Sequence, residues 1–382
     1  PCFTMSRLTY HQVLGSRQNG SGDTGENSRS SVTSVVLTHK MISDVSCLSE
    51  FQNLERLDLS CNSLTSLEAL RNCVNLKWLS VTKNKLESLQ GIEELCKLTV
   101  LNAGKNKLKS MEQVRSLGNL RALILNDNDI VLVCQLETKE LNTLVLSRNP
   151  IREIASSLKK MKSLTKVSLS HCQLESIGSA FKRCSELREA RFSHNEIKSL
   201  PAELEHNKKL QNLDIGNNVI TTWSDIKVLQ SLTSLKNLNI SGNPVADNLK
   251  CLKKMRTIVS KLRVFNSKPV ESIKKSWNDT SIEAEEIIAK RRKKNPESGN
   301  DECTKNQIEH RTVEKAKKKL SEVEVLDDCE APFADIVAVK SQEITEDTVR
   351  EEEEAIIVAP KKRKSRKTDP IFQKPFTIGT WD

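Results

Sequence analysis

The sequence predicts an α/β solenoid, in which short coils of chain stack so that their strands line up in one parallel, concave sheet. Three observations predict it. Leucines recur at a near-constant spacing, an asparagine recurs in register with them, and all but two of the leucines lie before residue 271. The 382-residue chain would therefore consist of a leucine-rich body, long enough to bury a core, and a charged tail.

The repeated unit reads LxxLxLxxNxL, where x is any residue. One copy is formed by Leu54, Leu57, Leu59, Asn62 and Leu64, and the next begins 22 residues later. Ten copies keep this register, and they begin at Val32, Leu54, Leu76, Leu98, Leu120, Leu141, Leu164, Leu187, Leu210 and Leu235. Internal repetition of this kind is the signature of stacked-repeat proteins, and the pattern is that of the leucine-rich repeat.

Each part of the repeat has a predicted conformation. The LxL alternation has a period of two, which predicts a short strand with its leucines facing inward. The apolar residues that follow at steps of three suit a helical or 3₁₀ return segment. The recurrent asparagine should satisfy backbone groups that the turn buries, so we interpret it as structural rather than as a ligand. Cys172 replaces it in one copy, and His171 and His194 take equivalent turn positions beside it.

The chain divides into four predicted segments. Ends of a solenoid need caps, and the tail has too few large apolar residues to offset the entropy of ordering it. The segments are an N-terminal cap element with a flexible linker (1–31), the leucine-rich repeats (32–250), a C-terminal repeat cap (251–270) and a disordered charged tail (271–382).

Composition and motifs argue against several classes of function. No apolar run approaches the roughly 20 residues that span a bilayer, so we expect no membrane association. The 11 cysteines form no CxxC pair, which indicates reduced thiols rather than disulfides or zinc. Nucleotide-binding, serine-hydrolase and metalloprotease motifs are missing, so we expect no enzyme, cofactor or metal. The net charge is +10, yet only 3% of residues are aromatic, which argues against nucleic acid as the partner.

The repeat register also predicts which side chains line the concave face. An apolar patch should be formed by Trp78, Val100, Ala122, Ile124 and Val145. A charged zone should follow toward the C-terminal half, formed by Lys166, Glu189, Arg191 and Asp214. An exposed aromatic beside aliphatic residues and rimmed by charge has the composition of an interface hot spot. We therefore predict a protein partner here, contacted by Arg56, Asp58, Trp78, Val100, Ile124, Val145, Glu189, Arg191 and Asp214.

A basic run stands in the tail after Pro360. It consists of Lys361, Lys362, Arg363, Lys364, Arg366 and Lys367. Such a run resembles a one-part nuclear import signal, whose cationic side chains bind a carrier protein. We therefore expect a nuclear import carrier as a second partner and the nucleus as the location, with the cytoplasm open as an additional one.

The 22-residue period with LxxLxLxxNxIxxLxxL, followed by a cap, resembles the intracellular leucine-rich-repeat subfamily typified by a regulatory subunit of protein phosphatase 1. The resemblance covers residues 32–270. It implies a non-enzymatic scaffold whose concave acidic and aromatic residues hold the phosphatase catalytic subunit, here Asp58, Trp78, Glu189 and Asp214. Two alternatives use similar repeats: a spliceosomal-type ribonucleoprotein component, and a cytoskeletal or axonemal adaptor.

Overall fold

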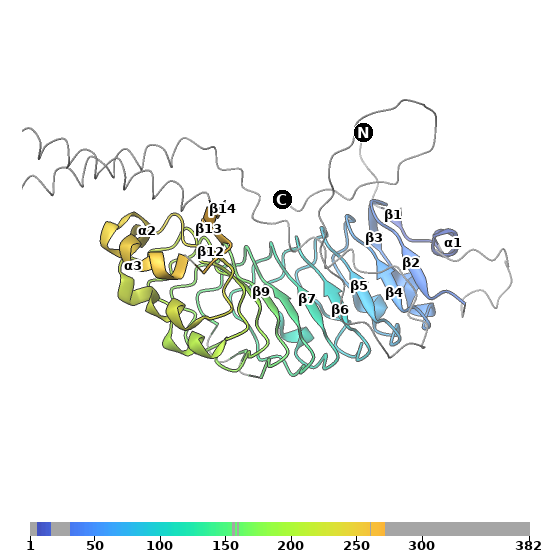
Figure 1. The fold of residues 1–382 in the computed structure, drawn as a ribbon. Helices are drawn as coiled ribbons and strands as arrows, with labels where there is room; N and C mark the ends of the chain where they lie inside the picture. Colours follow the sequence, from blue (N-terminus) through green and yellow to red (C-terminus); the bar gives the residue numbers. More distant parts are fainter. Residues whose placement is uncertain (1–5, 17–30, 155–156, 159, 260, 272–382) are drawn as a thin grey trace, which may run out of the picture. The chain divides into compact units, whose positions relative to one another are not determined.

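The computed structural model describes residues 6–16, 31–154, 157–158, 160–259 and 261–271 (Figure 1). The predicted tail, its nuclear import signal and most of the predicted N-terminal linker lie outside these residues. Within them, none of the helices is both long and apolar enough to cross a membrane.

The described chain is a stack of coils, each of which contributes one short strand to a single sheet (Figure 1). Each strand pairs in parallel with the strand of the next coil, and equivalent repeat positions face each other. The ten repeat strands are β2 (Ser34–Val36), β4 (Arg56–Asp58), β5 (Trp78–Ser80), β6 (Val100–Asn102), β7 (Ala122–Ile124), β8 (Thr143–Val145), β9 (Lys166–Ser168), β10 (Glu189–Arg191), β11 (Asn212–Asp214) and β12 (Asn237–Asn239). The predicted leucine-rich-repeat solenoid with one long parallel sheet is confirmed.

The leucines of the repeat form one continuous core. The central residue of each strand, such as Leu57, Leu79 or Leu101, is buried, as is the apolar residue two positions after it in every coil. Short 3₁₀ segments return the chain in some coils, as steps of three require. They are η2 (Ser46–Glu50), η3 (Glu68–Leu70), η4 (Glu112–Val114), η5 (Ala202–His206) and η6 (Trp223–Ser231).

An asparagine ladder joins the coils on the side where the chain leaves the strands. In Asn84, Nδ2 donates to Leu59 O (3.0 Å) in the previous coil and to Val81 O (2.9 Å) in its own. Its Oδ1 accepts from Leu64 N (2.9 Å), so one amide satisfies donors and acceptors of two coils. Equivalent bonds are made by Asn62, Asn106, Asn128, Asn149, Asn195, Asn218 and Asn243.

Cys172 interrupts this ladder. Its Sγ donates to Leu146 O (3.5 Å), as the amide nitrogen does in the other coils. The amide oxygen of those coils also accepts a backbone N–H from the previous coil, and a thiol is only a weak acceptor for such a group. That group, Ile151 N, instead donates to Asn149 O (2.8 Å) within its own turn. The substitution is therefore accommodated by a local rearrangement of one hydrogen bond.

Buried thiols form a second set of links at the return segments. Cys73 Sγ donates to Leu48 O (3.3 Å) and Cys134 Sγ to Met111 O (3.4 Å), each in the preceding coil. Asn207 takes the same role with Phe181 O (3.1 Å). The described cysteines are all free thiols, and the high cysteine content thus has a structural use in the stack.

Both ends of the core are covered. At the N-terminal end, β1 (Ser6–Arg7) pairs with β3 (Ile42–Asp44), and α1 (Tyr10–Gly15) follows. Thr9 and Gln12 form a capping box at the start of α1, and Tyr10 stacks on Phe51. At the C-terminal end lie α2 (Pro244–Asp247), α3 (Leu249–Val259), β13 (Val264–Phe265) and β14 (Lys268–Pro269).

The last two strands extend the sheet to twelve, two more than the repeats alone supply. β13 pairs in parallel with β12, and β14 turns back antiparallel. Asn266 Oδ1 accepts from Ile240 N (2.9 Å), which carries the ladder into the cap. Pro269 cannot donate a backbone hydrogen bond, so its position on the edge strand hinders further pairing.

The ladder predicts a large effect of one substitution. Replacing Asn84 by Ala would leave the buried N–H of Leu64 without a partner and would remove one of the two amide donors from each of Leu59 O and Val81 O. We therefore expect the free energy of unfolding to fall by about 1–3 kcal/mol. Urea denaturation followed by circular dichroism would measure it. The control is Lys85→Ala on the exposed surface of the same turn, expected to change stability by less than about 0.5 kcal/mol. Similar stabilities for the two variants would contradict the structural role of the amide.

Candidate functional site

The open face of the parallel sheet is the candidate site. The first and third residues of each strand point to this face, and the exact register of the pairing aligns them in two columns across the stack. The first column runs through Arg56, Trp78 and Val100, and the second through Asp58 and Ser80. The predicted partner-binding residues therefore all lie on one face of one sheet.

Trp78 is half-buried and does not stand alone. The guanidinium carbon of Arg56, on the neighbouring strand, lies 3.6 Å from the centre of the indole ring. This distance places a cation over the face of an aromatic ring, an attraction that strengthens as water is excluded. Burial lowers the pKa of Arg56, and the carboxylate of Asp58 opposes that shift.

The contact with Arg56 changes the predicted surroundings of Trp78. We expected Trp78 to rest mainly on Val100 and Ala122, but Arg56 from the other side covers one face of the indole. The sequence held the necessary signal, because Arg56 and Trp78 occupy the same repeat position one coil apart. Arg56 and Trp78 thus form one stacked unit on the concave face.

The apolar patch is less exposed than predicted. Ala122 and Ile124 are only 6% and 9% exposed, whereas Val100 and Val145 are half-buried. Strands of a sheet lie about 4.8 Å apart, so aliphatic side chains in adjacent coils shield one another. The accessible part of this patch is therefore formed by Trp78, Val100 and Val145.

The side chains of the predicted charged zone are less available to a partner than expected. Arg191 Nη2 lies 3.1 Å from Glu189 Oε1, and the two side chains are only 12% and 6% exposed. Asp214 Oδ1 accepts from Gly216 N (3.0 Å) and from Asn239 Nδ2 (2.9 Å). These charges are largely occupied by internal contacts. Glu189 and Arg191 are two residues apart on one strand and therefore share a face, and Asp214 contacts Asn239 on the next strand.

A column of small hydroxyl side chains was missed by the sequence analysis. Ser60 Oγ and Ser80 Oγ are 2.7 Å apart, and so are linked across two coils. Ser147 and Ser168 (2.6 Å), and Ser193 and Ser170 (3.0 Å), make the same kind of link further along. The sequence does contain a pattern that indicates this column, because Ser, Thr, Gly or Asn stands two residues after each repeat strand. These residues give the concave face a hydrogen-bonded floor beside the apolar patch.

The two histidines predicted at the surface stack on each other. The rings of His171 and His194 have centroids 4.0 Å apart and planes inclined by 11°. Asn217 Nδ2 lies within hydrogen-bonding distance of His194 Nε2, at 3.0 Å. Among the residues with described coordinates, no cluster of three or more His, Cys, Asp or Glu could hold a metal ion.

The buried thiols are poor nucleophiles. Burial raises the pKa of Cys73 and Cys184 to about 12, and that of Cys134 and Cys172 to about 11. They are therefore protonated at neutral pH, and the thiolate is the reactive form. Their role is the packing and hydrogen bonding of the stack.

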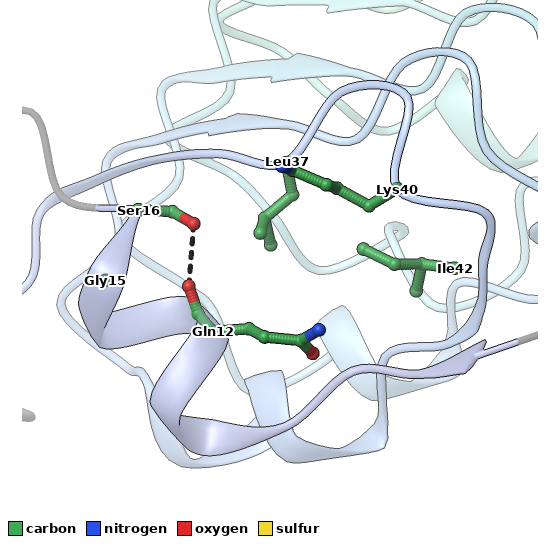
Figure 2. Close-up of a pocket in the computed structure, with 6 residues that line it drawn as sticks. All are labelled: Gln12, Gly15, Ser16, Leu37, Lys40 and Ile42. Carbon is green, nitrogen blue, oxygen red and sulfur yellow. Dashed lines mark hydrogen bonds between the residues drawn. The ribbon is translucent and has the colours of Figure 1, made fainter.

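One small hollow lies at the N-terminal end, away from the candidate site (Figure 2). It has a volume of about 250 Å³ and lies between α1 and the first coils. Its lining consists of Gln12, Gly15, Ser16, Leu37, Lys40 and Ile42. Ser16 Oγ donates to Gln12 O (2.6 Å), a bond that closes the end of α1 rather than holding a ligand.

Two family models match parts of the chain. "Leucine Rich Repeat" matches residues 53–73, and "Leucine Rich repeats (2 copies)" matches residues 185–228. No curated protein sequence matches the chain. The matched segments, the ten-copy register and the observed solenoid together define a leucine-rich-repeat protein.

Solved structures with the same fold come from distant sources. An internalin (inlF) of Listeria monocytogenes aligns with a TM-score of 0.56 at 22% identity, over 64% of this chain and 69% of its own. A leucine-rich-repeat protein of Leptospira interrogans gives 0.59 at 28%, over 62% and 61%. The plant peptide hormone receptor RGFR1 in complex with RGF2 gives 0.50 at 25%, over 56% and 36%. The chain thus spans less than two thirds of the last two proteins.

The buried ion pair leads to a prediction about stability. Glu189→Ala removes the carboxylate that faces the guanidinium of Arg191, and we expect unfolding to become easier by about 2–4 kcal/mol. The control is Asn237→Ala, an exposed position on the same face, with an expected change below about 0.5 kcal/mol. Differential scanning calorimetry would measure both. If Glu189→Ala melts like the unaltered protein, the pair is free to serve a partner instead.

Proposed function

We propose that this protein is a scaffold or regulatory subunit that binds a protein partner on its concave face. Leucine-rich-repeat proteins are typically non-enzymatic scaffolds for protein–protein interactions. The observation that carries the proposal is the Arg56–Trp78 stack beside Val100, on the second, third and fourth strands from the N-terminal end of that face. Tryptophan and arginine are the residue types most enriched among binding hot spots.

The rest of the face supports the same proposal. Around the stack lie an aliphatic strip and a floor of hydroxyl groups, so apolar contacts and hydrogen bonds are available side by side. Most of the polar atoms of this floor are already paired, which makes the surface pre-organised. The plant peptide hormone receptor RGFR1, which has the same fold, was solved in complex with RGF2.

The first partner to test is the catalytic subunit of protein phosphatase 1. The repeat period and cap resemble those of its leucine-rich regulatory subunit, and Asp58, Trp78, Glu189 and Asp214 match the residue types that the resemblance implies. Asp58 and Trp78 lie on adjacent strands, which makes them the stronger pair for this role. Glu189 and Asp214 are largely engaged within the chain, so they would contribute less.

Affinity purification of the tagged full-length chain, followed by mass spectrometry, tests the choice of partner. A phosphatase catalytic subunit as the leading specific protein would support the proposal. A set of ribonucleoprotein components, or of tubulin and dynein, would replace it with one of the two alternatives. The purified candidate would then be used for direct binding measurements.

Truncating the anchor should weaken binding without unfolding the protein. Trp78→Ala removes a central aromatic side chain, a change that typically costs about 2–4 kcal/mol of binding, or roughly 30- to 1000-fold in Kd. Because the indole is half-buried, we expect the free energy of unfolding to fall by no more than about 1 kcal/mol. Titration calorimetry with the purified partner and a thermal melt would measure the two effects.

The matched control is Val74→Ala, an exposed apolar residue 45% accessible in the same repeat but away from the strand. It should leave both binding and melting unchanged. If Trp78→Ala binds as tightly as the unaltered chain, the partner uses another surface. If it melts far lower, the side chain belongs to the core.

We also propose that the basic run in the tail directs the protein to the nucleus. Replacing Lys361, Lys362, Arg363 and Lys364 by alanine removes the charges that an import carrier would bind. A fluorescent fusion of the full chain should then stay in the cytoplasm. The basic run at Lys290–Lys294 is the weaker second candidate for the import signal, and we expect its replacement by alanine to leave the nuclear signal intact. Unaltered import after the first substitution would contradict the proposal.

A further inference from the structure

Four lysines gather where the chain leaves two neighbouring strands. Lys83 and Lys85 follow β5, and Lys105 and Lys107 occupy the same positions after β6. The backbone N–H of Lys83 donates to Gly104 O (3.0 Å), and that of Lys107 donates to Leu86 O (2.9 Å). The two turns are therefore in direct contact, and we call these four residues the lysine edge.

Three of these ammonium groups have no counter-charge in the part of the chain that the structure describes. Lys83, Lys85 and Lys107 are exposed, and their side chains make no ion pair or hydrogen bond there. Other lysines of the stack pair with a glutamate one coil earlier, as in Lys77–Glu55 (2.9 Å), Lys109–Glu87 (3.3 Å), Lys209–Glu186 (2.7 Å) and Lys198–Glu175 (3.7 Å). The lysine edge departs from this rule.

The turn itself does not require lysine. Lys83 and Lys105 have φ near +55°, a conformation for which asparagine is better suited than a long side chain. Other coils place Cys61, Asp127 or Asn217 at the same position with a similar φ. One coil further along, Asp127 pairs with Arg148 (3.8 Å), which balances the charge of that part of the edge. Three lysines without a counter-charge in the described chain thus lie together on two adjacent turns.

These two turns belong to the coils that carry the candidate anchor. Trp78 precedes Lys83 by five residues, and Val100 precedes Lys105 by five, so each pair is separated by at most about 17 Å of chain. A partner seated on the Arg56–Trp78 stack and Val100 would need only a few residues to reach the lysine edge. Its charge there would have to be negative.

We infer that the concave face takes an acidic protein segment that places carboxylates on the lysine edge and an apolar side chain against Trp78 and Val100. The inference rests on the proposed function and specifies the chemistry of its partner. A protein fits better than a nucleic acid, because the surface beside the lysines is aliphatic or hydroxylic. Its one large aromatic ring is already covered on one face by Arg56, which leaves little area for stacking bases.

The test uses the full-length chain and a defined probe, a fluorescein-labelled peptide of four Glu-Glu-Leu repeats. A second peptide replaces every Glu with Gln, and a third probe is a single-stranded oligo-uridine. Fluorescence anisotropy would give each affinity at low and at moderate salt. We expect the acidic peptide to bind, the Gln peptide to bind at least about tenfold more weakly, and salt to weaken the acidic peptide alone, because screening acts on exposed charges.

The variant is the triple substitution Lys83→Glu, Lys85→Glu and Lys107→Glu, expected to weaken the acidic peptide by about tenfold or more. The matched control is Lys162→Glu, Lys182→Glu and Lys227→Glu, three exposed lysines outside the sheet, which changes the net charge equally. It should reduce binding much less. Thermal melts of both triple variants would establish that each is folded.

The outcomes separate this inference from the proposed function. Loss of peptide binding in the lysine-edge variant but not in the control supports the acidic partner. Equal effects of the two triple variants, no binding of the acidic peptide, or tighter binding of the oligo-uridine would overturn it. Trp78→Ala in the same assay tests the anchor separately. Binding that depends on Trp78 but not on the lysines would retain the proposed function and reject the acidic partner.

Discussion

Everything in this structure depends on how neighbouring coils satisfy each other's buried backbone groups. A 22-residue coil is too short to form its own core or to pair its own polar groups. The side-chain amides of the ladder pair these polar groups, since each amide donates to carbonyls of two coils and accepts an N–H from the earlier coil. Each coil is thereby held at a fixed position relative to the one before it, and errors of register are excluded along the whole stack.

The fixed register determines what the concave face can offer. Equivalent residues of adjacent coils lie side by side. Similar side chains at one repeat position of two or three adjacent coils therefore form a continuous patch. The stack of Arg56 on Trp78 arises this way, and so do the linked hydroxyls and the lysine edge. The same alignment pairs polar groups of neighbouring strands, as between Asp214 and Asn239, and Glu189 pairs with Arg191 within one strand. The residues left for a partner are those whose neighbours do not complement them.

Residues that are paired within the chain and residues that remain available to a partner lie in different parts of the concave face. The C-terminal half carries charges and amides that bind each other, so substitutions there should be felt mainly as changes of stability. The coils of β5 and β6 carry a covered indole, an accessible valine, and three lysines (Lys83, Lys85 and Lys107) that have no counter-charge within the described chain. Binding energy at an interface is concentrated in a few such positions, and the surrounding paired groups contribute shape.

The sequence by itself determined the number of repeat strands, their parallel register and the two columns of concave residues. It could do so because one local pattern repeats ten times, and each copy has a single way to bury its leucines. It also indicated the asparagine ladder, although not the extension of that ladder to Asn266 in the cap. Only the tertiary structure decided which concave side chains remain available. Glu189 and Arg191 belong to one strand, and the structure shows that their side chains pair with each other. The burial of Ile124 and the cover of Arg56 on Trp78 depend on side chains of adjacent coils, and no single repeat contains that information.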